Sequence, residues 1–144
     1  MLLSRKCVYA LRAVLYVAQH DTGAYVPIGE ISENLKISFH FLTKILQILT
    51  QNQIMISYRG PSGGINLAKS ANDITVLDII YIIDGDKKFK ECILGLPDCI
   101  DTNPCALHET WTSYCQSLKN ELSNMTIKDL VLDIKESNLR ISGR

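Results

Sequence analysis

The sequence predicts a mostly α-helical protein with one small β-hairpin. Apolar residues recur at helical spacing over most of the chain, and the period becomes extended only around residues 54–68. A glycine-rich segment separates the two extended stretches, which is typical of a hairpin. We therefore expect a winged helix-turn-helix over residues 1–72, followed over residues 73–144 by a cysteine-bearing loop and further helices.

The first predicted helix spans residues 4–20. Apolar residues in it recur at i, i+3, i+4 and i+7 spacing, at Leu11, Val14, Leu15 and Ala18. Residues 21–25, which include Gly23, end this helix. Pro27 opens a short helix, and a stronger apolar pattern runs from Phe39 to about Gln51. A turn of roughly three to four residues between these two helices predicts a helix-turn-helix, whose second helix enters the major groove of DNA.

The extended segments at residues 54–58 and 65–68 form the predicted hairpin. Between them lie three glycines, one proline and, at the base, Arg59. Glycine has no side chain that would block a close approach to a phosphate backbone. We therefore interpret the hairpin as a wing that contacts DNA.

Capping patterns mark the helices of the second half. Thr75 and Asp78 have the spacing of a capping box and begin a short apolar helix that ends at Ile83. Thr126 and Asp129 repeat the pattern before a last helix, and residues 137–144 are expected to be frayed.

A longer helix is expected from Pro104 to about Leu122. Asn103 is suited to the N-cap and Pro104 to the first helical position, so that Cys105 would lie in the first turn. A thiolate there would be favoured by the partial positive charge of the helix N-terminus.

Cys92, Cys99, Cys105 and His108 fall within seventeen residues and are the most specific feature of the chain. Thiolates and imidazole are soft ligands that suit zinc or an iron–sulfur cluster. Structural zinc sites usually contain C-x2-C pairs, whereas the gaps here are six, five and two residues. These wide gaps favour a loop around something larger than one ion.

The alternative is that these cysteines are ordinary buried residues or oxidise readily. Five cysteines in a chain of this length, three of them in one polar loop, favour ligation instead. Cys7 and Cys115 lie in helical patterns, and we expect both to pack in a core or an interface.

With 144 residues, 47% of them hydrophobic, the chain can form one core and a small extension. It contains no apolar run of the roughly 18 to 20 residues that a membrane span needs, and no secretory signal pattern. We expect a cytoplasmic protein with reduced thiols and no membrane association.

The net charge is zero, but it is unevenly distributed. Residues 1–72 contain seven Lys or Arg and three Asp or Glu, whereas residues 73–144 contain eight Lys or Arg and twelve Asp or Glu. The basic first half is therefore the part expected to meet a polyanion such as DNA.

Four segments and the cysteine loop, in this order, resemble the Rrf family of bacterial winged-helix transcriptional regulators, repressors among them, and specifically its IscR- and NsrR-like, iron–sulfur-binding branches. The segments are residues 9–12 (Tyr-Ala-Leu-Arg), 28–37, 41–46 (Phe-Leu-Thr-Lys-Ile-Leu) and 59–64 (Arg-Gly-Pro-Ser-Gly-Gly). The resemblance spans nearly the whole chain.

The resemblance implies a homodimer in which the helix after the cysteine loop packs against its symmetry mate. Two winged helices would then read a pseudo-palindromic operator in double-stranded DNA. The implied DNA-binding positions are Ser38, His40, Thr43, Lys44, Arg59 and Gly60. Taken singly, each helix position can also be read as a solvated polar residue. Relatives often have an acidic residue where this chain has Thr43, so a different operator preference is expected.

The resemblance also implies that Cys92, Cys99 and Cys105 are cluster ligands and that His108 is the fourth ligand, as in the IscR-like branch. The first gap is one residue longer than usual there. In another branch the partner subunit supplies a carboxylate at the position of Val8, which cannot ligate; its neighbour Cys7 is an outside candidate. The histidine ligand favours a 2Fe-2S cluster. Because the loop is wide, a 4Fe-4S cluster remains an alternative.

The function predicted from the sequence is a DNA-binding regulator whose operator affinity depends on an iron–sulfur cluster that senses nitric oxide, redox state or iron–sulfur status. One alternative is a cluster-free regulator of the same fold that senses through its thiols or a partner, and another is a structural zinc site. An enzyme using Cys105 and His108 as nucleophile and base is disfavoured, because the chain shows no oxyanion-hole motif.

Overall fold

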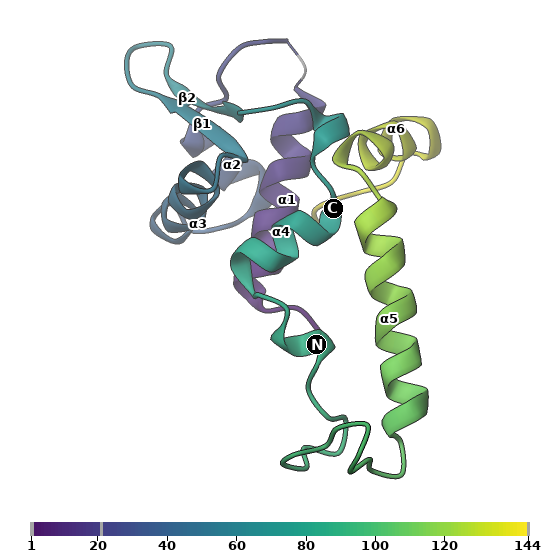
Figure 1. The fold of residues 1–144 in the computed structure, drawn as a ribbon. Helices are drawn as coiled ribbons and strands as arrows, with labels where there is room; N and C mark the ends of the chain where they lie inside the picture. Colours follow the sequence, from purple (N-terminus) through teal and green to yellow (C-terminus); the bar gives the residue numbers. More distant parts are fainter. Residues whose placement is uncertain (1, 21, 144) are drawn as a thin grey trace.

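The computed structural model describes residues 2–20 and 22–143; Asp21, in the predicted end of the first helix, lies outside the described residues. Within these residues six α-helices, two 3-10 turns and one hairpin follow one another along the chain (Figure 1). Their bounds are α1 Arg5–Gln19, α2 Ile28–Leu35, α3 Phe39–Gln51, β1 Met55–Tyr58, β2 Gly64–Leu67, η1 Ala71–Asp73, α4 Val76–Ile83, η2 Lys87–Phe89, α5 His108–Asn124 and α6 Ile127–Ser137.

The predicted fold class is confirmed. Helices α1 to α3 and the β1–β2 hairpin form a winged helix-turn-helix, and α4 and α6 pack against α1. Helix α5 stands beside this body and carries the loop that connects η2 to α5 at its far end (Figure 1).

The turn between α2 and α3 is held by local hydrogen bonds. Lys36 adopts a left-handed conformation with φ of 57°, and its backbone N–H donates to the carbonyl of Ser32. The Ser32 hydroxyl donates to the carbonyl of Ile37 over 2.6 Å. Ser38 then caps α3 by accepting a hydrogen bond from the N–H of Phe41. These bonds fix the angle at which α3 leaves α2.

The wing is an antiparallel pair in which Met55 faces Leu67 and Tyr58 faces Gly64. Val26 adds a third segment, because its N–H and carbonyl each bond to Ile65 over 2.8 Å. Gly64 has a φ of +157°, and a Cβ built there would lie 2.2 Å from the carbonyl oxygen of Val26. Only glycine therefore permits this pairing, which joins the wing to the segment before α2.

One main core joins both halves of the chain. It is formed by buried residues of α1, α2, α3, the hairpin, α4 and α6, among them Ala13, Ile31, Leu42, Ile45, Ile65, Ile79 and Ile127. A second cluster, made of Cys7, Val76, Leu77, Ile80 and Phe89, packs against Leu118 and Leu122 of α5. Burial of this apolar surface is the main favourable term in folding.

A polar contact connects the start of α1 to the end of α4. The carboxylate of Asp84 accepts the backbone N–H of Ser4 over 2.9 Å and also the hydroxyl of Ser4, while that hydroxyl oxygen caps α1 by accepting from Cys7 N–H. A carboxylate is favourable at a helix N-terminus because unpaired N–H groups give that end a partial positive charge. Asp84 is followed by Gly85, where the chain leaves the body toward the cysteine loop.

The predicted start of the long helix is wrong. Helix α5 begins at His108, after Leu107, and its N-cap makes no side-chain hydrogen bond. Asn103 instead closes a turn: its N–H donates to the carbonyl of Ile100 over 2.8 Å, and its side chain donates to the carbonyl of Asp98. Asn103 is therefore used within the loop, and Cys105 precedes the helix.

The packing expected for Cys7 and Cys115 is confirmed, since both side chains are buried. Among the described helices, none combines the length and the apolar character needed to cross a bilayer.

Replacing Gly64 with alanine should lower the free energy of unfolding by at least about 1–3 kcal/mol, the usual range for one strained residue, because the new Cβ collides with backbone. Chemical denaturation measures this change. Gly29→Ala is the control: its Cβ meets open space in α2, and helix propensity predicts a small gain. Equal stability of the two variants would contradict the assigned wing pairing.

Candidate metal centre and candidate nucleic-acid interface

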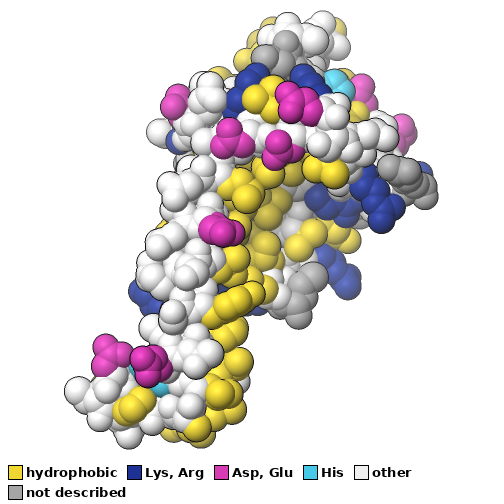
Figure 2. All heavy atoms as spheres, turned by 90° about the vertical axis from the view of Figure 1, so that its right-hand side faces the viewer, with side chains coloured by type: hydrophobic (Ala, Val, Ile, Leu, Met, Phe, Trp, Pro, Cys, Tyr) yellow, Lys and Arg dark blue, Asp and Glu magenta, His cyan; other side chains and the backbone are white. Residues whose placement is uncertain are grey.

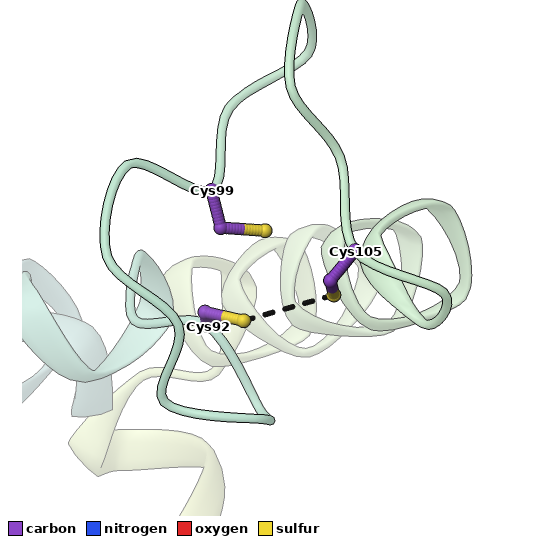
Figure 3. A group of neighbouring side chains, drawn as sticks. All are labelled: Cys92, Cys99 and Cys105. Carbon is purple, nitrogen blue, oxygen red and sulfur yellow. Dashed lines mark hydrogen bonds between the residues drawn. The ribbon is translucent and has the colours of Figure 1, made fainter.

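Three cysteine side chains converge in the loop before α5. The Sγ atoms of Cys92, Cys99 and Cys105 lie within 4.8 Å of one another, and those of Cys92 and Cys105 are 3.6 Å apart (Figure 3). All three are half-buried. The structure thus brings together the three cysteines predicted as ligands.

His108 is the fourth member of the group and the first residue of α5. Its Nδ1 lies 3.2 Å from Cys99 Sγ, and its Nε2 lies 2.9 Å from Asp101 Oδ1. An ionised carboxylate can only accept a hydrogen bond, so Asp101 assigns the ring proton to Nε2 and leaves Nδ1 free to ligate. Asp101 was not predicted, because no spacing rule connects a loop carboxylate with a histidine seven residues later.

Two hydrogen bonds hold the first part of the loop. Gly95, with φ of 68°, closes a turn by donating its N–H to the carbonyl of Cys92. The indole N–H of Trp111 in α5 donates to the carbonyl of Glu91 over 2.9 Å, which fixes the start of the loop against the helix. A cavity of about 380 Å³ is lined by the three loop cysteines and, among other residues, by Phe89 and Cys115.

The thiols differ in acidity. A hydrogen bond from the Leu96 backbone is the main reason why the pKa of Cys92 falls to about 7. A hydrogen bond with the Cys105 backbone lowers the pKa of Cys99. Burial and the neighbouring Cys92 and Cys105 thiols raise it by more, so the net effect is a raised pKa. Burial, followed by the charge of Asp84, raises the pKa of Cys7 to about 12. One thiolate therefore forms readily in the loop, while Cys7 stays protonated.

These donors suit a soft metal centre. Thiolates and a neutral imidazole are ligands for zinc and for iron–sulfur clusters. A tetrahedral zinc ion with Zn–S bonds of about 2.3 Å places its sulfurs about 3.8 Å apart. The 3.6 Å between Cys92 and Cys105 is close to that spacing, so a larger cluster would require the exposed loop to widen.

A second feature is a groove of about 760 Å³ between α3, the start of α2 and the wing. Thr43, Arg59 and Gly60, three of the residues predicted to bind DNA, line this groove. Ser38, His40 and Lys44 are exposed on or beside α3 and are not among the lining residues. The structure thus divides the predicted DNA-binding residues between the groove and the adjoining helix surface.

Phe39 also lines the groove and was not predicted to be functional. Its side chain is 56% exposed, although the apolar pattern of α3 places it on the same face as Leu42 and Leu46. Helical periodicity alone indicates core packing for such a residue, so only a signal from tertiary structure could have identified it.

A winged helix-turn-helix with a groove between α3 and the wing is typical of a DNA-binding transcriptional regulator. The Rrf2 family model, described as an iron-dependent transcriptional regulator, matches residues 3–133. The chain therefore belongs to the Rrf2 family of transcriptional regulators.

Individual relatives agree with this assignment. The chain is 35% identical to the HTH-type transcriptional regulator IscR of Pectobacterium carotovorum, over 91% of this chain and 79% of that one. It is 32% identical to IscR of Photorhabdus laumondii, over 100% of this chain and 86% of that one. These relatives are regulators of transcription and not enzymes, and the same class applies here.

Solved structures share the fold. IscR from T. potens superposes with a TM-score of 0.77 and 25% identity, covering 96% of this chain and 91% of the other. CymR, the global cysteine regulator of B. subtilis, superposes with a TM-score of 0.75 and 23% identity, covering 90% and 95%. At this identity, the similarity to CymR supports the fold alone.

In the metal-free protein, alkylation of Cys92 by iodoacetamide should reach half its plateau rate near pH 7, because the thiolate is the reactive form and the pKa of Cys92 is lowered to about 7. Cys7, whose pKa is raised to about 12 in a buried position, should stay unmodified at the same pH. Mass spectrometry of each cysteine across pH measures both. A midpoint for Cys92 at the ordinary thiol value, near pH 8.5, would contradict the assigned hydrogen bonding.

Proposed function

We propose that this protein is a dimeric regulator whose affinity for a pseudo-palindromic operator is controlled by an iron–sulfur cluster. The observation that carries the proposal is the convergence of three thiols and one imidazole in a single exposed loop of a chain that belongs to an iron-dependent family. The cluster would report nitric oxide, redox state or iron–sulfur status.

Cys92, Cys99 and Cys105 would hold the cluster, with His108 Nδ1 as the fourth ligand. A bound cluster supplies a redox-active centre that nitric oxide and oxygen attack. Asp101 orients the His108 ring toward the thiols, as carboxylates commonly do for ligating histidines. The histidine favours a 2Fe-2S cluster over a 4Fe-4S cluster. Cys7 is enclosed within its own subunit, which argues against its acting as a ligand for a partner.

The loop is placed to act on the DNA-binding part through two contacts. It begins after α4, whose end is bonded to the start of α1 through Asp84 and Ser4. It ends at α5, whose Leu118 and Leu122 pack on the cluster formed by Val76, Leu77 and Ile80. A change in loop geometry can therefore shift α4 relative to α1, and a coupling of about two to three kcal/mol would change operator occupancy substantially.

Helix α5 would form the dimer interface. Cys115 is the only buried residue among its seventeen residues, and Tyr114 is 63% exposed. Figure 2 shows hydrophobic side chains in a strip that runs from the loop end of the molecule toward the body. Covering an exposed apolar strip with a second copy of the chain would be favourable, because it removes apolar surface from water.

DNA contact would be confined to residues 1–72, the winged helix-turn-helix domain, while residues 73–144 hold the cluster and dimerise. The proposed contacts are Ser38, His40, Thr43 and Lys44 at the start of α3, with Arg59 and Gly60 on the wing. A regulator that meets chromosomal DNA with reduced thiols belongs in the cytoplasm.

A zinc centre is the second candidate for the loop. The spacing of 3.6 Å between the sulfurs of Cys92 and Cys105 is close to the sulfur–sulfur distance around one tetrahedral ion. Zinc would stabilise the loop, and sensing would then fall to the thiols or to a partner protein.

Protein purified without oxygen should absorb visible light and contain iron and sulfide in near-equal amounts. Replacing Cys92, Cys99 and Cys105 with alanine should abolish this absorbance and remove any effect of nitric oxide on operator affinity, because the cluster loses three ligands. Spectroscopy, metal assay and operator titration measure these results.

Cys115→Ala is the control, since Cys115 is a buried cysteine outside the ligand set. A colourless protein that contains zinc would favour the second candidate. A colourless, zinc-free protein, still so after attempted cluster reconstitution, would favour a cluster-free thiol- or partner-sensing regulator. An intact response to nitric oxide in the triple alanine variant would contradict cluster control.

Replacing Lys44 or Arg59 with alanine should weaken binding to all DNA sequences alike and reduce the slope of log affinity against log salt by about 1, because each cation would neutralise one phosphate. Fluorescence anisotropy at several salt concentrations measures the slope. Lys135→Ala in α6 removes an equal charge from the other half of the chain and should leave the slope unchanged. Three equal slopes would contradict the proposed DNA surface.

A further inference from the structure

Phe39 is an apolar side chain placed where a recognition helix meets DNA. It is the first residue of α3, is 56% exposed and lines the groove beside the wing. The first residues of a recognition helix are those that contact base edges in the major groove. A large aromatic side chain at this position is available to bury its surface against a ligand in the groove.

Thr43 adds to the same surface. It lies one turn after Phe39 on α3 and lines the same groove. Its hydroxyl donates to the carbonyl of Phe39 over 2.8 Å. The hydroxyl proton is therefore used within the helix, and Thr43 can offer a partner its methyl group and an acceptor oxygen, but not a donor.

The charges around these two residues indicate the ligand. Arg59 lies on the wing side of the groove, and Lys44 is exposed next to Thr43 along α3. A surface that has cations around an apolar side chain suits a polyanionic ligand that also presents a hydrophobic group. In the major groove of DNA that group is the C5-methyl of thymine, which none of the other three bases carries.

We infer that Phe39, together with the methyl group of Thr43, reads thymine C5-methyl groups at the operator positions beneath the start of α3. The inference rests on the proposed role of α3 as the recognition helix. It gives this chain an operator preference distinct from that of relatives with an acidic residue at the position of Thr43, because an acidic side chain accepts from the amino group of cytosine.

The test separates the methyl group from hydrogen bonding at thymine. Full-length protein, purified without oxygen, first selects its preferred sites from random double-stranded DNA. Each conserved thymine of a selected site is then replaced by deoxyuridine, which keeps the O4 acceptor and lacks only the methyl group. For wild-type protein we expect a loss of about fourfold in affinity for each contacted methyl, the fold-change that burial of one such group gives.

The variant Phe39→Ala should lose most of the difference in affinity between thymine and deoxyuridine sites, and the Thr43 methyl group accounts for the remainder. Phe39→Leu should keep a larger part of the difference because leucine is also apolar. Ile56→Ala is the matched control: Ile56 is 46% exposed on β1, is not among the groove-lining residues, and its loss should leave the deoxyuridine effect intact. Phe39 is exposed, so its replacement should not unfold the protein, and thermal melting checks this.

Three outcomes would overturn the inference. The first is equal wild-type affinity for thymine and deoxyuridine sites, and the second is an unchanged deoxyuridine effect in Phe39→Ala. The third is a change of oligomeric state in Phe39→Ala, which would identify Phe39 as a protein contact. Failure to select any DNA would overturn the proposed function itself.

Discussion

Burial of α1 is the interaction on which the rest of the structure depends. Its inner face consists largely of small residues, including Ala10, Ala13 and Ala18, and it contacts α2, α3, β2, α4 and α6. Small side chains allow these elements to approach closely, and close packing transmits a displacement better than loose packing does. Arg12 strengthens the arrangement, because its guanidinium donates to the carbonyls of Leu35 and Ile141. Both halves of the chain are therefore tied to one helix.

The cysteine loop, unlike α1, is loosely packed. Its backbone makes few regular hydrogen bonds, several of its large apolar side chains are exposed, and the thiols are brought together by turns at Gly95 and Asn103 and by the Trp111 contact. Such a segment gains little from packing, so a bound metal group would contribute much of its order. A loop of low intrinsic stability attached to a well-packed core would suit the reporting role proposed for it, because its state can change while the core remains intact.

Much of the fold could be predicted from local sequence. The bounds of α4 match the prediction, and the capping boxes at Thr75 and Thr126 are both formed, because a cap depends only on residues three positions apart. The burial of Cys7 and Cys115 followed from helical periodicity. The start of α5 could not be predicted, because Asn103 suits an N-cap and a loop turn equally well, and the choice depends on its contact with Asp98.

The sequence by itself determined the winged helix, the family and the set of three cysteines, since each depends on local patterns along the chain. Only the tertiary structure decided that Asp101 contacts His108, that Phe39 remains exposed beside the wing, and that the core joins both halves. The physical reason is that the exposure of Phe39 and the shared core depend on distances between segments remote in sequence, while the Asp101–His108 contact depends on the path of an irregular loop that has no sequence period. Helical period gives the direction in which a side chain points, but whether a neighbour covers it depends on how the whole chain packs.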